Sequence, residues 1–376
     1  PSITPLKEQP LGRVPLVVPR NASDRLLLEN ADDILPGPAL LVLINGTSLS
    51  RHLIYARRDV NWTVFTCEHF YLTAVVRTLE QDDELSETDI RLFCTPDLPN
   101  GPYATVILAT DSRGSSELTR DLLQSIAACL QPDGRLLIST NNPKDHWLHQ
   151  LLKETYGRIT VRKASDGVCY IARRRDKPGK QKSYDAEFAF RDGERLIRCA
   201  SRPGVFSHRR VDPGARALVR SLDLLNESCD RFDPLRPQKI VEMGCGCGAV
   251  ATAAALRYPE AQVLAVDSHA RAVQSTERTA ALNEAANLSV LLTSDGGIPE
   301  PGTWDLFLCN PPYYSDYRIS ELFLLSAEEA LRRGGRVGLV TKLTDWHENR
   351  MIEIFANAKV HSFGEYNVIV SVKRNS

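Results

Sequence analysis

The stretch that decides the fold reads Glu242-Met243-Gly244-Cys245-Gly246-Cys247-Gly248. The short apolar run Lys239–Met243 predicts a buried strand, and the alanine-rich run Ala249–Arg257 predicts a helix. Glycines between a strand and a helix let the backbone turn tightly and let a ligand approach the main chain without a Cβ in the way. The helix points the positive end of its dipole at the bound group. The stretch therefore predicts a strand–loop–helix site for a cofactor.

An acidic residue strengthens this prediction. Asp267 follows the apolar run Gln262–Val266, nineteen residues after Gly248. A carboxylate at the end of the second strand can accept hydrogen bonds from two ribose hydroxyls. However, Gly244, Gly246 and Ala249 also satisfy the dinucleotide pattern. The loop and Asp267 together predict a ribose-bearing cofactor and leave its identity open.

Strand and helix patterns alternate through the rest of this half. Further strands are predicted at Ser289–Leu292, Trp304–Cys309 and Arg336–Val340, with helices over about Arg271–Glu284 and about Glu321–Arg332. Such alternation predicts an α/β fold with a doubly wound, mostly parallel sheet. Two final runs, Lys359–Ser362 and Tyr366–Val372, predict a terminal hairpin. Class I methyltransferases end in such a hairpin, and dinucleotide dehydrogenases do not.

The first half of the chain repeats this plan at a nearly constant offset. Leu130–Arg135 precedes Leu331–Arg336 by 201 positions, and Tyr103–Leu108 matches Trp304–Leu308 in the same frame. A repeat of this length predicts a tandem duplication. We therefore expect two tandem Rossmann-like class I methyltransferase domains at 1–172 and 185–376. The basic stretch 173–184 between them is predicted to be a linker.

The first copy lacks the predicted cofactor-binding and catalytic residues of the second. When the copies are aligned on the strand, three side chains replace the glycines of the loop: Asn45, Thr47 and Leu49. Ala109-Thr110-Asp111 replaces the residues that follow the fourth strand, and Glu68 falls where Asp267 does. We expect this degenerate copy to bind no cofactor and to help hold the substrate.

The predicted catalytic segment is Asn310-Pro311-Pro312-Tyr313, which follows the fourth strand and so lies at the carboxyl edge of the sheet. Two prolines fix φ and remove two N–H groups, which leaves the Pro311 carbonyl as an acceptor beside the Asn310 side chain. Two rigid acceptors suit an exocyclic amino group, and Tyr313 offers a face for stacking. Alignment of nitrogen, methyl and sulfur would supply most of the acceleration.

These features together favour S-adenosylmethionine over a dinucleotide. Glu242 stands where methyltransferase motif I has its acidic residue, and the segment Asn310–Tyr313 has no counterpart in dehydrogenases. Ser294-Asp295-Gly296 follows the third strand and is placed to reach an adenine amino group. The predicted cofactor residues are Glu242, Gly244, Cys245, Gly246, Gly248, Asp267, Ser268, Asp295, Gly296 and Asn310.

The chain resembles the bacterial ribosomal RNA guanine-N2 methyltransferases, in which a silent N-terminal domain precedes an active one. Pro203–Ser207 and Val211–Arg216 look like that family's approach to the helix over the cofactor. The resemblance covers about 200–374 and is architectural over 1–172, apart from Ala22–Leu27. It implies methylation of a guanine N2 in ribosomal RNA or a ribosomal subunit. The family usually has Phe and His where this chain has Tyr313-Tyr314, and either aromatic side chain can stack on a base.

Other functions remain open at this point. Asn-Pro-Pro-Tyr also occurs in adenine-N6 methyltransferases and in enzymes that methylate the glutamine amide of release factors. A non-catalytic RNA-binding module is a rival of another class, which the intact Asn310–Pro312 segment disfavours. The duplicated architecture favours RNA guanine.

Composition and charge define the setting of this chemistry. The 376 residues carry a net charge of −1, yet Arg173–Arg220 holds fourteen Lys and Arg against six Asp and Glu. This basic stretch is the predicted RNA contact. Nine scattered cysteines without a C-x-x-C pair predict neither a disulfide framework nor a metal site and fit the cytoplasm. No apolar run is long enough for a membrane helix.

Overall fold

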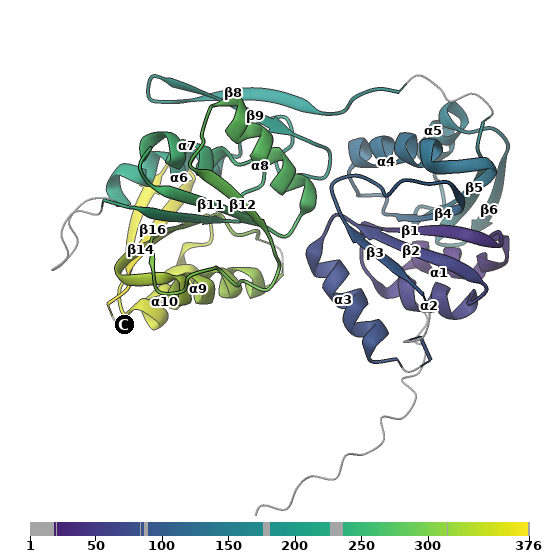
Figure 1. Cartoon of the computed structure of the whole chain (residues 1–376), viewed down its shortest axis with the longest axis horizontal. Coiled ribbons are helices and arrows are strands. Elements are labelled where there is room, and N and C mark those ends of the chain that lie inside the picture. The colour runs from purple at the N-terminus through teal and green to yellow at the C-terminus, as the bar shows by residue number, and fades with distance from the viewer. Residues whose placement is uncertain are drawn as a thin grey trace, which may run out of the picture.

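The computed structural model describes residues 19, 21–82, 84–85, 89–175, 181–225, 236–313 and 315–374. They form two seven-stranded sheets flanked by helices, and a two-stranded sheet (Figure 1). No described helix has the length and apolar character needed to cross a bilayer. The prediction of two tandem Rossmann-like domains is confirmed.

The first domain contains one sheet with helices on both faces. Its elements are α1 (Ala22–Glu29), a 3-10 turn η1 (Ala31–Asp33), β1 (Gly37–Leu43), α2 (Ser48–Ala56), β2 (Val60–Thr66), α3 (His69–Glu80), β3 (Arg91–Cys94), β4 (Tyr103–Thr110), α4 (Ser116–Cys129), β5 (Leu130–Thr140), α5 (Trp147–Thr155), β6 (Ile159–Ala164) and β7 (Gly167–Arg173). The strand order is β3-β2-β1-β4-β5-β7-β6. Only β7 runs antiparallel to its neighbours.

The second domain follows a hairpin of β8 (Ala186–Asp192) and β9 (Arg195–Ser201). Its elements are α6 (Pro213–Leu225), β10 (Lys239–Met243), α7 (Ala249–Arg257), β11 (Gln262–Asp267), α8 (Ala270–Leu282), β12 (Leu288–Leu292), β13 (Trp304–Cys309), α9 (Arg318–Ala330), β14 (Leu331–Thr341), α10 (Thr344–Phe355), β15 (Lys359–Phe363) and β16 (Tyr366–Val372). The strand order β12-β11-β10-β13-β14-β16-β15 repeats that of the first sheet, position for position.

Each sheet is buried on both faces, as expected for strands that form continuous apolar runs. In β10, Ile240 packs into the core under α6, α7 and α8, and Val241 packs into the core over α9 and α10. In the view of Figure 1 the layer of α6, α7 and α8 lies above its sheet, and the corresponding layer of α1, α2 and α3 lies below its own. The two domains are therefore turned over relative to each other.

The two domains contact each other through backbone hydrogen bonds at the starts of α3 and α8, which are equivalent helices in the two copies. The N–H of His69 donates to the carbonyl of Ser268 at 2.8 Å, and the N–H of Ala270 donates to the carbonyl of Cys67 at 2.7 Å. At the sequence offset of 201, His69 corresponds to Ala270 and Cys67 corresponds to Ser268. The two bonds are therefore equivalent, one donated by each domain. A contact in which i meets j and j meets i is the signature of a two-fold interface. The duplicated halves pair like two subunits of a symmetric dimer.

A buried arginine strengthens this interdomain seam. Arg271 of α8 is 1% exposed and reaches across to the first domain. It forms an ion pair with Asp121 at 2.8 Å and donates to the Pro96 carbonyl at 2.8 Å, while a third bond goes to the Pro203 carbonyl within its own domain. Removing one partner of a buried ion pair is costly, because the other charge is then left buried without compensation. The two domains are therefore held in one fixed arrangement.

The predicted bounds of some elements were wrong at their ends. β14 begins at Leu331 and not at Arg336, because Leu331 pairs with Trp304 before an irregular turn and Arg336 pairs with Leu306 after it. α9 begins at Arg318, three residues before the predicted start at Glu321. The predicted domain limits stay predictions, and 1–18 and 176–180 lie outside the described residues.

Candidate active site

Three neighbouring strands end together at one edge of the second sheet. Met243, the last residue of β10, is paired with Val266 of β11 on one side and with Cys309 of β13 on the other. The residues that follow these strands are therefore side by side. The predicted cofactor loop, Asp267 and Asn310 meet at this carboxyl edge, where open parallel sheets bind ligands.

The glycine loop holds backbone conformations that other residues adopt at a cost. Gly246 has φ of 57°, and a Cβ built there would have nothing within 4 Å. Gly248 has φ of 77° and is the N-cap of α7, and a Cβ there would come within 2.7 Å of Thr276. Gly246 thus leaves space for a ligand, whereas Gly248 permits close packing against α8.

The carboxylate of Asp267 ties this loop to β11. It accepts the N–H of Gly246 at 2.9 Å through one oxygen and the N–H of His269 at 2.9 Å through the other. Burial raises the pKa of Asp267 above its usual value, against the opposing effect of these two bonds. Each carboxylate oxygen keeps further lone-pair capacity for a ribose hydroxyl.

Glu242, which was predicted to bind cofactor, is buried at the end of β10, and its role toward cofactor stays a prediction. Its side chain is 3% exposed, and its carboxylate accepts the N–H of Ala251 in the first turn of α7 at 2.6 Å. Burial raises its pKa well above the usual value. In this arrangement Glu242 anchors the helix that follows the loop.

The two loop cysteines face away from the edge of the sheet. Cys245 is 5% exposed with its sulfur 3.3 Å from the Thr276 hydroxyl, and Cys247 is 7% exposed. Their side chains belong to the core between the sheet and α6–α8. Any contact of Cys245 with a cofactor would therefore come from its backbone. No cluster of three or more metal-ligating side chains occurs among the described residues.

The loop after β12 carries the residues predicted to meet adenine. Asp295 accepts hydrogen bonds from the Thr293 hydroxyl at 2.7 Å and the Gly297 N–H at 2.9 Å, and these bonds lower its pKa. Gly296 has φ of 82°, and a Cβ there would lie 2.5 Å from the Ser326 hydroxyl. Asp295 is thus held as a fixed, ionised acceptor.

The catalytic segment shows a hydrogen bond that sequence reasoning missed. The Asn310 amide donates from Nδ2 to Oδ2 of Asp212 at 3.0 Å. The same Asp212 oxygen accepts the N–H of Ala215 in the first turn of α6. With Nδ2 committed to Asp212, Asn310 Oδ1 is left as an acceptor. Asp212 was part of a recognised motif, but nothing in the sequence pairs it with Asn310.

Beyond Asn310, the segment changes from buried to exposed. Pro311 is buried, whereas Tyr313 is 46% exposed and its hydroxyl accepts the N–H of Lys342 at 3.2 Å. Partial burial raises the pKa of Tyr313. Tyr314 lies outside the described residues. Tyr313 is thus anchored at its hydroxyl with much of its surface available.

The first domain contributes side chains beside Asp267 and Ser294. The Ser268 hydroxyl donates to the Glu68 carboxylate at 3.3 Å, and His69 Nδ1 lies 2.9 Å from the Ser294 hydroxyl. Burial, together with the negative charge of Asp267, raises the pKa of Glu68 to about 7. Residues 200 positions apart thus share one site, which no local pattern reveals.

The alignment of the two copies needs two corrections. Thr47 is the N-cap of α2 as Gly248 is of α7, so the predicted match of Leu49 with Gly248 was wrong by two residues. Leu49 is 2% exposed in the core of the first domain. Glu68 is the N-cap of α3 and corresponds to His269, not to Asp267 as predicted.

Much of the basic stretch is already engaged. Arg174 and Arg175 donate to backbone carbonyls of the first domain, and Arg202 forms an ion pair with Asp97 at 2.6 Å. Arg209 pairs with Glu117 at 3.0 Å. Arg202 and Arg209 therefore join the two domains, whereas Arg174 and Arg175 hold the chain against the first domain. A role of the stretch in RNA binding stays a prediction.

Comparison with known proteins shows that most of the second domain is similar to a known domain family. The model of the methyltransferase small domain matches residues 197–370. The match includes the glycine loop, Asp267 and the segment that begins at Asn310.

Two curated relatives extend this result. Ribosomal RNA small subunit methyltransferase C of Pseudomonas entomophila is 34% identical over 168 residues, which are 44% of this chain and 46% of that protein. Ribosomal RNA large subunit methyltransferase G of Streptomyces coelicolor is 27% identical over 288 residues, 72% of each chain. The first match spans less than half of that relative's length. The predicted resemblance to ribosomal RNA methyltransferases is confirmed.

One solved structure shares the arrangement of both domains. The 16S rRNA N2 methyltransferase of T. thermophilus, solved with AdoMet and guanosine, aligns with a TM-score of 0.74. The alignment covers 94% of this chain and 92% of that one at 22% identity. The shared feature is the fold of two tandem domains.

Proposed function

We propose that the protein is an S-adenosylmethionine-dependent methyltransferase that acts on a guanine N2 of ribosomal RNA. The observation that carries this proposal is the Asn310 amide, which Asp212 orients at 3.0 Å beside the glycine loop. Its free Oδ1 and the carbonyl of Pro311 form a pair of acceptors at the carboxyl edge. The names of the relatives and the tandem fold support the substrate class.

The residues at this edge fit S-adenosylmethionine. Gly246 opens onto free space, Asp267 keeps acceptor capacity for ribose, and Asp295 is fixed at the end of β12. Ser268, Gly244 and Gly296 line the turns between these points, and Glu242 anchors α7. When bound, S-adenosylmethionine supplies an electrophilic methyl group.

The chain's own residues would act chiefly by orientation. Asn310 Oδ1 and the Pro311 carbonyl accept the two hydrogens of the amino group, and this turns the nitrogen lone pair out of conjugation with the ring. Tyr313 stacks on the base, with its hydroxyl held by Lys342. No strong general base is required, because the proton leaves after the nitrogen has gained the methyl group. Preorganised acceptors of this kind typically contribute two to three orders of magnitude.

The substrate is ribosomal RNA, free or within a subunit, and the reaction takes place in the cytoplasm. Residues 1–172 hold the RNA without binding cofactor, and Arg173–Arg220 adds phosphate contacts through those arginines that are not engaged in ion pairs. Methylation of adenine N6 or of a protein glutamine uses the same pair of acceptors. The tandem fold favours RNA guanine over both.

A nucleoside analysis tests the proposal. Ribosomal RNA is incubated with the protein and labelled S-adenosylmethionine, digested and separated by mass spectrometry. We expect label in N2-methylguanosine, and a rate of labelling about two to three orders of magnitude lower with Asn310→Ala. Label in N6-methyladenosine would replace the guanine assignment. RNA binding without label in any nucleoside would identify a binding module instead.

A further inference from the structure

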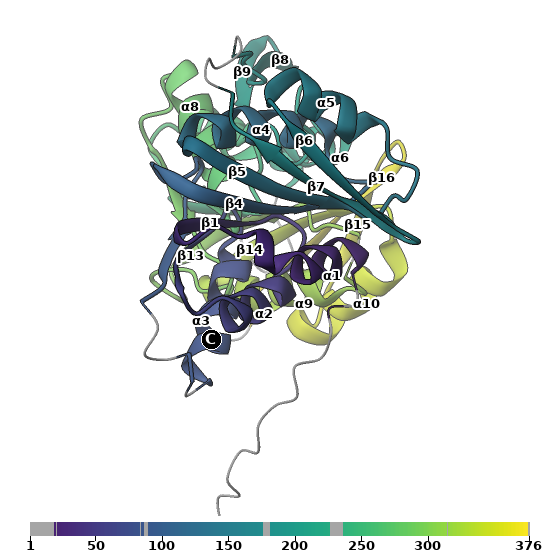
Figure 2. The same cartoon turned by 90° about the vertical axis from the view of Figure 1, so that its right-hand side faces the viewer.

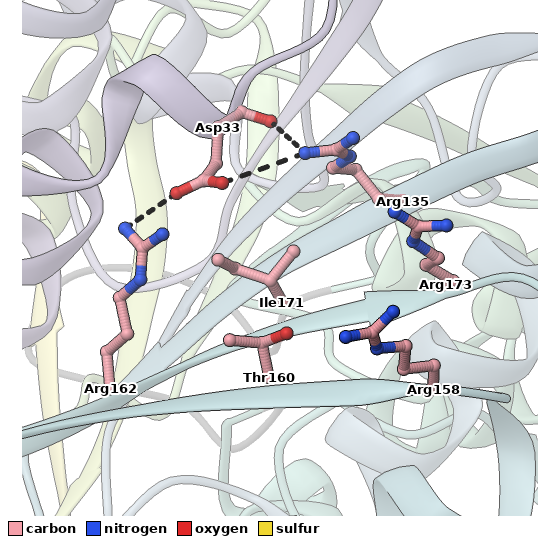
Figure 3. Close-up of a pocket in the computed structure, with 7 residues that line it drawn as sticks. All are labelled: Asp33, Arg135, Arg158, Thr160, Arg162, Ile171 and Arg173. Atoms are coloured by element: carbon pink, nitrogen blue, oxygen red, sulfur yellow. Dashed lines mark hydrogen bonds and ion pairs between the residues drawn. The ribbon is translucent and has the colours of Figure 1, made fainter.

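A pocket in the first domain gathers four arginines. It has a volume of about 150 Å³ and is lined by Arg135, Arg158, Arg162 and Arg173 together with Asp33 and Thr160. In Figure 3 the guanidinium groups of Arg135, Arg173 and Arg158 follow one another along one side, and Arg162 lies on the other. Arg173 begins the basic stretch described above, and the other three arginines have no part in the proposed methyl transfer.

Strand geometry explains why these side chains converge. Arg135 of β5 pairs with Arg173 of β7, and Thr160 of β6 pairs with Ile171 of β7. The carbonyl of Arg158 accepts the N–H of Arg173 at 3.0 Å, which extends the row by one residue. Because side chains alternate along a strand, all of these point to one face of the sheet. The row crosses three adjacent strands.

The positive charge of this pocket is only partly balanced. Asp33 pairs with Arg162 at 2.6 Å and with Arg135 at 3.7 Å. The side chains of Arg158 and Arg173 make no ion pair or hydrogen bond with any residue in the described part of the chain. Buried Nε of Arg135 also has no partner among the described residues. Like charges directly opposite each other on neighbouring strands are destabilising. An anion in the pocket would remove this cost.

We propose that this pocket binds phosphate groups of the RNA backbone, which rests on the proposed RNA substrate. The planar guanidinium matches phosphate oxygens through paired N–H donors. A row of three guanidiniums suits consecutive phosphates of a chain better than one small ion. Such contacts position the RNA without selecting a base.

The position of the pocket in the first sheet determines which RNA can contact both the pocket and the active site. Arg135 pairs with Thr105 near the start of β4, whereas Glu68 and His69 follow the end of β2. The pocket therefore lies toward the amino edge of the first sheet, and the interdomain seam lies at its carboxyl edge. RNA held there reaches the catalytic edge only if it extends along the first domain, as a large structured RNA does.

The test compares two matched double variants of the full chain. Arg158→Gln/Arg173→Gln removes the two exposed arginines without partners among the described residues. Arg77→Gln/Arg333→Gln removes the same charge from exposed positions elsewhere. Binding of fluorescently labelled single-stranded RNA is measured by anisotropy over a range of salt. We expect the pocket variant to bind about tenfold more weakly and its salt slope to fall by about 0.7 per lost contact, while the control binds like wild type.

Every outcome of this experiment is informative. Equal RNA affinity in wild type and the pocket variant, or equal weakening in both variants, would overturn the proposal. If calorimetry shows that inorganic phosphate binds to wild type, but the pocket variant binds RNA as tightly as wild type does, the pocket binds a small anion instead. A wild-type protein that binds RNA through the pocket but methylates no nucleoside would refute the proposed function and leave the pocket standing. Arg158→Lys/Arg173→Lys should recover part of the binding, because it restores charge without the paired donors.

Discussion

The two halves of this chain share one sheet topology but differ where their central strands end. After β10 the second copy has Gly244 and Gly246 with positive φ, followed by the N-cap Gly248, whose φ is also positive. After β1 the first copy has Gly46 and the N-cap Thr47 with φ of −115°. Both loops connect a strand to a helix, so the fold does not require the glycine loop. The glycines are explained by a ligand, and function resides in the site and not in the fold.

The difference extends to what each copy presents at its carboxyl edge. β13 is followed by Asn310 and two prolines, and β4 ends in Ala109 and Thr110. The first copy instead presents Glu68 and His69 to its partner across the seam. In the proposed mechanism, one copy thus keeps the acceptors and the other supports the site from across the seam. Variants at matching places in the two copies test this division.

The largest effect is expected at Asn310. Asn310→Ala removes an acceptor for the amino group, so turnover should fall by about two to three orders of magnitude. The dissociation constant of S-adenosylmethionine should stay close to the wild-type value. Single-turnover kinetics and calorimetry measure the two quantities. Asp111→Ala, after the equivalent strand of the first copy, should leave both unchanged. If Asn310→Ala also lost affinity for S-adenosylmethionine, Asn310 would be a cofactor-binding residue.

A smaller effect is expected at the end of the second strand. Asp267→Ala leaves ribose hydroxyls and the Gly246 N–H without an acceptor and should weaken cofactor binding by roughly 1–3 kcal/mol. Thr66→Ala, at the end of β2, removes only a bond to the Glu68 N–H and should bind cofactor like wild type. Calorimetry on both variants gives the comparison. Unchanged affinity in Asp267→Ala would remove this residue from the site.

The seam itself predicts a pH dependence. The pKa of Glu68 is raised from 4.5 to about 7 by burial and by Asp267, so the folded protein favours the protonated form. The stability that this group contributes is present below about pH 4.5 and is lost as the pH rises to about 7. The pKa of His269 is lowered to about 4, so this neighbour stays neutral above pH 5.

Urea unfolding at pH 5 and pH 8 measures this contribution. Since the Glu68 side chain is still 35% exposed, solvent screening limits the effect to about 1 kcal/mol. Wild type should lose that much more stability than Glu68→Gln between the two values. Glu80→Gln, at the far end of α3, should behave like wild type. The same pH dependence in Glu68→Gln would show that other groups titrate.

The sequence predicts the residues that stand at strand ends, but not the contacts between distant parts of the chain. The glycine loop, Asp267 and Asn310 each lie at the end of an apolar run, so the strand pattern alone predicts that they meet at one edge of the sheet. The bond between Asp212 and Asn310, and the contact of Glu68 with Ser268, join residues that are far apart in the chain. The arginine pocket depends on strand register. Glu68 was matched with Asp267 because the loops of the two copies were aligned two residues out of register, whereas Glu68 and His269 are the equivalent N-caps.

The smallest expected effect is in the first copy, where cofactor binding should be absent. Thr47 has a Cβ and negative φ where Gly248 has φ of 77°, so the loop before α2 takes a different path. Calorimetry of the full chain should therefore give a single equivalent of S-adenosylmethionine. Thr47→Gly should leave the isotherm unchanged. Gly248→Ala should weaken it, because its Cβ would lie 2.7 Å from Thr276. Two equivalents in wild type would restore the first copy as a second cofactor site and would end the division of roles between the two domains.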